Sequence, residues 1–167
     1  MMTHGTYDEF WQARNLRPHL RNIKPAVLTV GGWFDADNLF GALETFRRIE
    51  AASPDTTNLL VMGPWEHGGW VGGRSDGSSL GHVSFNARTA EFYREKMELP
   101  FFEFSLKGKG TLLHPKAWVF ETGANQWWQY ATWPPQNTKA LALYFHAKGR
   151  LSHDPPRESA DEMGYDE

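Results

Sequence analysis

Two apolar stretches separated by one amphipathic segment constrain the fold of this chain most strongly. Residues 25–32 (PAVLTVGG) and 59–63 (LLVMG) are continuously apolar, which is typical of strands buried on both faces of a parallel sheet. Between them, residues 38–52 carry apolar side chains at helical spacing, with Asn38 as the expected N-cap. Strand, helix and strand in this order predict a βαβ unit.

Polar side chains follow both of these strands. Asp35 follows the first strand in the stretch LTVGGWFDAD (28–37), and His67 follows the second strand in NLLVMGPWEHGGW (58–70). The carboxyl ends of parallel strands share one edge of a sheet, so we expect the two side chains to meet there. A carboxylate that orients an imidazole forms two thirds of a Ser-His-Asp system. The alternative is that Asp35 caps the following helix and His67 is a loop histidine.

A nucleophile for this pair is not evident in the chain. A G-x-S-x-G match, GSSLG with Ser79 at its centre, lies after His67 in the glycine-rich stretch 68–82, which is predicted to be a loop. A nucleophile elbow instead follows a buried strand, so Ser79 is the less favoured alternative. The chain has no cysteine, no HExxH and no metal-spaced histidines, so neither a metal site nor a cofactor is predicted.

The second half of the chain changes in character after Gly110. Residues 87–97 and 99–110 predict two helices, the second with Pro100 in its first turn. Residues 116–123, 126–135 and 140–146 are short aromatic and apolar segments between turns, which is typical of an antiparallel sandwich. We therefore place a boundary near 108–115, with domains at 1–110 and 111–167. The polar, acidic end from 152 leaves the second domain incomplete.

Two motifs together resemble one enzyme family. VGGWFDADNLFGALETFRRIE followed by LLVMGPWEHGGW is similar to the CocE/NonD, or X-Pro dipeptidyl-peptidase, branch of the serine α/β-hydrolases. The resemblance implies that Asp35 is the triad acid and His67 the base. EFYREKMELPFFEFSLKGKG resembles the helix pair that closes the family's hydrolase domain, and AWVFETGANQWWQYATWPP resembles the start of its jelly-roll. The fold class expected is therefore α/β, the C-terminal part of an α/β-hydrolase parallel sheet followed by the beginning of a β-sandwich (jelly-roll).

The same resemblance implies what lies outside the chain. The family's serine elbow, its oxyanion tyrosine and most of its cap precede the matched region, so we expect a fragment that is inactive by itself. The parent would be a serine hydrolase that cleaves ester or amide (acyl or peptidyl) bonds through an acyl-enzyme. In the family's α-amino acid ester hydrolases two acids follow the triad aspartate and hold an ammonium group. Here Asp37 and Asn38 stand in their place, which weakens the case for an α-amino substrate.

Four residues beside the predicted dyad are candidate substrate contacts, namely Trp33, Phe34, Asp37 and Trp65; the alternative for the aromatic ones is the core. The expected partner is a small ester, amide or peptide, and we expect the full-length parent to be an oligomer. A net charge of −3 gives no reason to expect nucleic acid, and no apolar run is long enough for a membrane span. The alternative function is a non-catalytic jelly-roll module that binds carbohydrate or protein.

Overall fold

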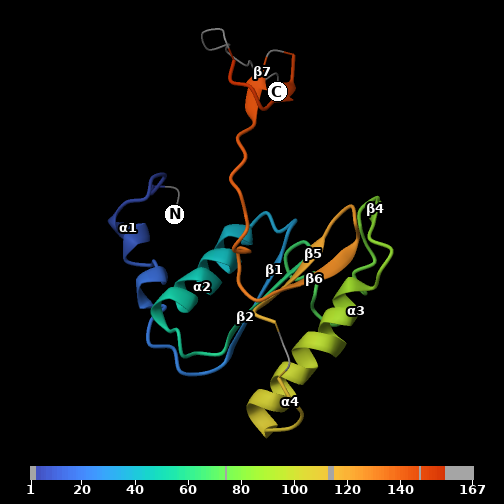
Figure 1. The fold of residues 1–167 in the computed structure, drawn as a ribbon. Coiled ribbons are helices and arrows are strands. Elements are labelled where there is room, and N and C mark those ends of the chain that lie inside the picture. Colours follow the sequence, from blue (N-terminus) through green and yellow to red (C-terminus); the bar gives the residue numbers. More distant parts are fainter. Residues whose placement is uncertain (1–2, 74, 113–114, 147, 157–167) are drawn as a thin grey trace. The chain divides into compact units, whose positions relative to one another are not determined.

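The computed structural model of the protein describes residues 3–73, 75–112, 115–146 and 148–156. The chain forms two compact units, Met1–Trp133 and Pro134–Glu167. The first contains a four-stranded sheet in the order β1-β2-β5-β6 (Figure 1), whose strands are β1 (Val27–Gly32), β2 (Asn58–Gly63), β5 (Ala117–Glu121) and β6 (Gln126–Tyr130). In the second unit, β7 (Tyr144–His146) and β8 (Arg150–Ser152) form an antiparallel hairpin.

The predicted βαβ unit is present. β1 pairs in parallel with β2 from Val27–Asn58 to Gly32–Gly63, and α2 (Leu39–Ala52) connects them. Every residue of β2 is buried, whereas the first four residues of β1 are only partly buried. The difference arises because β2 lies between β1 and β5 while β1 lies at the edge of the sheet. Burial on both faces therefore holds for β2 and only in part for β1.

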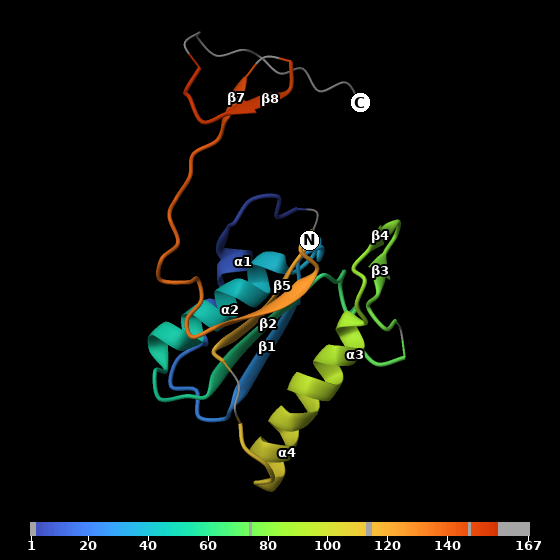
Figure 2. The same ribbon diagram turned by 45° about the vertical axis from the view of Figure 1, so that its right-hand side comes forward.

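Helices cover both faces of the sheet. Figure 2 shows α2 on one side and α3 (Thr89–Tyr93) on the other. Successive residues of a strand point to opposite faces, so Leu60 and Met62 of β2 pack against α2 while Val61 packs against α3. The result is a three-layer α/β/α arrangement with two hydrophobic clusters, one on each face of β2.

The two helices predicted over 87–110 are one continuous helical segment. α3 is followed without a gap by a π-helical turn, η2 (Arg94–Glu98), and then by α4 (Leu99–Lys107). The irregular turn lies just before Pro100, whose nitrogen cannot donate a helical hydrogen bond. Gly108 ends α4 in the left-handed conformation, with φ of 63°, as the sequence predicts.

Residues 117–130 lie in the α/β sheet and not beyond a boundary at 108–115, where the sequence placed them. β5 pairs in parallel with β2, and β6 pairs antiparallel to β5. Ala117 and Val119 join the cluster under α2, while Trp118 packs on the opposite face. Because both faces of β5 are covered, this strand extends the three-layer core, and the compact units divide only after Trp133.

The jelly-roll stays a prediction. Within the described part of the second unit, the regular structure is the β7–β8 hairpin, and the acidic residues 157–167 lie outside the described residues. The remaining short elements are α1 (Glu9–Gln12), η1 (Arg17–His19), β3 (Ser79–Leu80) and β4 (Val83–Ser84). The described helices include none with the length and apolar character that crossing a bilayer demands.

Candidate active site

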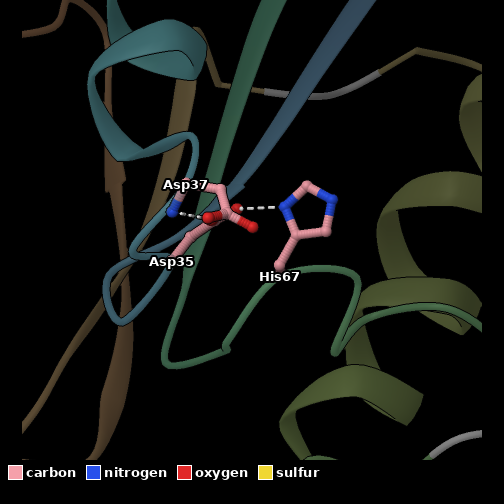
Figure 3. A group of neighbouring side chains, drawn as sticks. All are labelled: Asp35, Asp37 and His67. Carbon is pink, nitrogen blue, oxygen red and sulfur yellow. Dashed lines mark hydrogen bonds and ion pairs between the residues drawn. The ribbon is translucent and has the colours of Figure 1, made fainter. Parts of the chain in front are cut away.

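The structure brings Asp35 and His67 together at the carboxyl ends of β1 and β2. Gly32 and Gly63 are register partners at the last position of the two strands, so the turns that follow them leave the same edge of the sheet. Oδ2 of Asp35 lies 3.0 Å from Nδ1 of His67 (Figure 3). The expected meeting of these side chains is present, and their catalytic role stays a prediction.

The Asp35 carboxylate is buried, and both of its oxygens take part in hydrogen bonds. Its side chain is 2% exposed, and Oδ1 accepts hydrogen bonds from the backbone N–H groups of Asp37 and Asn38, each at 2.9 Å. Burial by itself raises the pKa of Asp35, but the bonds from Asn38, His67 and Asp37 outweigh it and hold this pKa below its ordinary value. Asp35 is therefore a carboxylate at neutral pH.

Each oxygen of Asp35 serves one of the two roles that the sequence left open. Oδ1 fixes the backbone that leads into α2, and Oδ2 receives the imidazole. Asn38 stands at the N-cap position of α2, but its side chain makes no capping bond. Asn38 thus has the expected N-cap position without the expected capping bond.

The backbones of the two turns are interlocked. Trp33 donates its N–H to the carbonyl of Gly63 at 2.9 Å, and Phe34 donates to the carbonyl of Trp65 at 3.1 Å. A Cβ atom on Gly32 would lie 2.1 Å from that same Trp65 carbonyl oxygen. Glycine at 32 is therefore required by the close approach of the two turns, which together form one frame for the dyad.

The buried Asp35 carboxylate holds the His67 imidazole at Nδ1. The His67 side chain is 60% exposed, and its Nδ1 faces the buried carboxylate. When Nδ1 carries the proton that the carboxylate accepts, Nε2 is the basic nitrogen of the ring. The arrangement can therefore accept a proton from a hydroxyl at Nε2 and stabilise the resulting imidazolium.

Two of the four candidate substrate contacts are core residues in this structure. Trp65 is 2% exposed and packs against the rings of Trp70, Tyr93 and Trp127. Trp33 is half-buried, packs against the cluster under α2, and donates its indole N–H to the carbonyl of Phe120 at 2.9 Å. Both rings turn from the strand ends into the hydrophobic layers, which favours the core alternative that the sequence left open for them.

Phe34 and Asp37 remain accessible next to the dyad. Phe34 is 46% exposed and stacks against Phe85 with ring centroids 6.4 Å apart. Asp37 is exposed, and ligand atoms of Asp35, Asp37 and His67 lie within 4.8 Å of one another. Such atoms could hold a divalent cation. In this structure, however, the two Asp35 oxygens already take part in three hydrogen bonds, one of them with His67.

Ser79 does not lie on a nucleophile elbow. It is an exposed residue of β3 and pairs with Ser84 of β4 in a short antiparallel hairpin. An elbow requires a sharp turn from a strand into a helix, and the chain instead reverses into β4. The structure therefore gives no support to Ser79 as the missing member of a triad.

Sequence reasoning missed Thr89, a fully buried residue that touches the site through Trp65. Its hydroxyl oxygen lies 2.9 Å from the indole nitrogen of Trp65 and 2.7 Å from the carbonyl oxygen of Gly77. No local pattern singles out this threonine, because both of its partners are distant along the chain. The only signal, a hydroxyl at the start of a helix, is the ordinary signature of a cap.

Comparisons with known proteins agree with this architecture. Residues 1–69 match the family model described as X-Pro dipeptidyl-peptidase (S15 family). Cocaine esterase of Rhodococcus sp. (strain MB1 Bresler) is 26% identical over 151 residues, which are 89% of this chain and 25% of that protein.

Two solved structures resemble the chain closely. An aminopeptidase from the marine sediment archaeon Thaumarchaeota archaeon superposes with a TM-score of 0.81 and 32% identity, over 91% of this chain and 25% of its own. A selenomethionine-labelled α-amino acid ester hydrolase superposes with a TM-score of 0.78 and 31% identity, over 92% of this chain and 26% of its own length. The chain therefore spans about a quarter of the length of these relatives.

The mixed sheet with its parallel strands is compatible with part of an α/β-type hydrolase. The family match over residues 1–69 and the similar proteins support a CocE/NonD-type hydrolase family for this chain.

Proposed function

We propose that the protein containing this chain is a serine hydrolase that cleaves ester or amide bonds through an acyl-enzyme. The single observation that carries the proposal is the 3.0 Å contact between Oδ2 of buried Asp35 and Nδ1 of accessible His67. The names of the similar proteins, an esterase, an aminopeptidase and an ester hydrolase, support the reaction class. The nucleophilic serine is proposed to lie upstream of residue 1.

In the proposed reaction, His67 moves the proton and Asp35 holds His67. Nε2 of His67 removes the hydroxyl proton as the serine oxygen forms its bond to the substrate carbonyl carbon. The imidazolium then gives this proton to the departing alcohol or amine, whose bond to carbon breaks. Water repeats the sequence on the acyl-serine, which releases the acid and restores the serine. Asp35 stays ionised throughout, as its lowered pKa favours.

The proposed substrate is a small ester, amide or peptide that reaches His67 from the solvent-exposed side. Phe34 offers an exposed aromatic surface one residue before the triad acid, and its stacking on buried Phe85 holds that surface in place. Asp37 adds one exposed carboxylate beside the dyad. We propose these two residues, and no longer Trp33 or Trp65, as substrate contacts from this chain.

The test uses the full natural polypeptide that contains residues 1–167, with p-nitrophenyl butyrate as the probe. Asp35→Asn should lower kcat by about 10⁴-fold, because it favours the wrong imidazole tautomer. His67→Ala should cause a loss of similar order, because the general base is gone. The matched controls Asp55→Asn and His82→Ala change exposed residues outside the dyad and should leave kcat unchanged. Near-normal activity in either dyad variant would refute the proposal.

Labelling by a fluorophosphonate probe locates the nucleophile. We expect mass spectrometry to find the label on a serine upstream of this chain, with labelling abolished in His67→Ala. A label on Ser79 would overturn the upstream assignment and would make the 167-residue chain self-sufficient.

A further inference from the structure

The hydroxyl of Thr89 lies where three separate segments meet. Thr89 is 0% exposed, and its oxygen accepts a hydrogen bond from the indole N–H of Trp65 at 2.9 Å while donating to the carbonyl of Gly77 at 2.7 Å. One hydroxyl thus joins the turn after β2, the loop before β3 and the beginning of α3. Accepting one bond and donating another is a combination that a valine of the same shape cannot provide.

This hydroxyl is not an ordinary helix cap. Thr89 is the first residue of α3, and the cap position is held by Arg88, which makes no side-chain capping bond. The Thr89 side chain points to Trp65 and Gly77, which lie 24 and 12 positions away in the sequence. Its bonds are therefore tertiary, and what they fix is the position of the Trp65 ring and of the Gly77 backbone.

The contact at Gly77 is tight. A Cβ atom on Gly77, whose φ is 76°, would lie 2.5 Å from Oγ1 of Thr89 and 2.4 Å from the backbone nitrogen of Ala90. The loop backbone therefore lies directly on the first turn of α3, and this close approach requires glycine at 77. The Thr89 hydroxyl is held between the Trp65 indole and the Gly77 carbonyl.

Trp65 in turn connects Thr89 to the dyad. The backbone carbonyl of Trp65 accepts the N–H of Phe34, the residue before Asp35, and His67 follows Trp65 by two residues. The Trp65 ring covers Gly63 so closely that a Cβ atom there would lie 2.4 Å from it. A rotation of the buried ring would therefore move the turn that carries His67 relative to the turn that carries Asp35.

We propose that Thr89 is a positioning residue for the dyad, which it serves by holding the Trp65 ring and hence the His67 turn in register with Asp35. This inference rests on the proposed function. It goes beyond that function in assigning part of the catalytic geometry to a buried side chain that touches neither substrate nor dyad. A misplacement of about 1 Å at reacting groups is enough to cost up to 100-fold in rate.

The test compares Thr89→Val with Thr56→Val in the full natural polypeptide, with p-nitrophenyl butyrate as the probe. Thr56 is a second buried threonine whose hydroxyl bonds to a backbone carbonyl, that of Ile23. It precedes β2, so it lies about 20 Å along that strand from the site. Thr56→Val loses one hydrogen bond and Thr89→Val loses two, so calorimetry should show a lower Tm for both variants and the larger loss for Thr89→Val.

The two variants should differ in kinetics. Thr89→Val should lower kcat about 10- to 100-fold with little change in KM, because only the chemical geometry is disturbed. Thr56→Val should leave kcat unchanged, and Thr89→Ser, which keeps the hydroxyl, should restore it. Equal kcat in Thr89→Val and Thr56→Val would overturn the positioning role.

A second variant keeps the test decisive if Thr89→Val does not fold. Trp65→Phe removes the same hydrogen bond from the donor side while retaining an aromatic ring, and the same fall in kcat is expected. Where Thr89→Val does fold, combining the two changes should lower kcat no further than the larger single loss, because both delete the Trp65–Thr89 hydrogen bond. If the fall in kcat of the double variant equalled the product of the two single falls, Trp65 and Thr89 would act independently and the proposed coupling between them would be refuted. Should Asp35→Asn and His67→Ala be active, the proposed function itself fails, which is a separate outcome.

Discussion

Gly32→Ala tests whether the interlocked turns position the dyad. The added Cβ would lie 2.1 Å from the carbonyl oxygen of Trp65 and 2.8 Å from its carbonyl carbon. Ordinary van der Waals contact begins at 3.4 Å, so the two backbones must separate by about 1.3 Å. No side-chain rotation can relieve this contact, because the obstructing atoms belong to the backbone of the turn that carries His67.

The expected consequence is a loss of activity out of proportion to the loss of stability. A separation of about 1 Å between the Asp35 and His67 turns should lower kcat/KM by about 100-fold. Overpacking of this kind costs about 1–3 kcal/mol in the free energy of unfolding. The assay is p-nitrophenyl butyrate hydrolysis by the full natural polypeptide, with the folded fraction measured by circular dichroism.

Gly31→Ala is the matched control at the neighbouring position. Its Cβ would lie 2.8 Å from Cβ of Ala42 and 2.9 Å from Sδ of Met62, so it meets side chains, and the thioether is flexible enough to move. It should lose stability without moving the Trp65 carbonyl, and so retain most of its activity. If both variants lose activity in proportion to stability, the interlocked turns do not set the catalytic geometry.

Two further predictions concern the pH dependence of stability in the 167-residue chain. The lowered pKa of Asp35 means that its carboxylate stabilises the fold above an ordinary pKa of about 3.9, and that this contribution disappears as the pH falls through the lowered value. Urea unfolding between about pH 6 and pH 2 should therefore show a steeper loss for the wild type than for Asp35→Asn, and parallel curves would contradict it. Hydrogen bonds from Arg48 and Arg47 likewise hold the pKa of Glu44 below its ordinary range, so Glu44→Gln should lower Tm at neutral pH, with a difference that shrinks below about pH 4. If the Tm difference between the wild type and Glu44→Gln were the same below about pH 4 as at neutral pH, the ion pairs of Glu44 with Arg48 and Arg47 would not stabilise the fold.

The sequence predicted the dyad because its placement needs little tertiary information. Two neighbouring apolar strands with a helix between them pair in parallel, and residues just beyond their carboxyl ends must lie at one edge of the sheet. Asp35 and His67 satisfy this condition, and the 3.0 Å contact between them follows from the register of Gly32 with Gly63. The motifs also indicated the hydrolase family that the comparisons support.

Which of the aromatic side chains after the two strands are buried could not be predicted in the same way. Trp33, Phe34 and Trp65 have the same local setting, a position directly after an apolar strand, yet Trp65 is 2% exposed and Phe34 is 46% exposed. The difference depends on α3, which covers the face of the sheet toward which Trp65 turns. A helix that begins 24 residues after Trp65 leaves no trace in the local pattern.

The amino-acid sequence by itself determined the βαβ unit, the strand ends that carry Asp35 and His67, and the resemblance to a hydrolase family. These features depend on periodicity and on contacts between neighbouring elements. Only the tertiary structure decided that β5 joins β2 in parallel, that Trp65 is a core residue and that Thr89 is bonded to its indole. Such pairings join residues far apart in the chain, and their free energy depends on which surfaces remain uncovered once the nearer elements have packed.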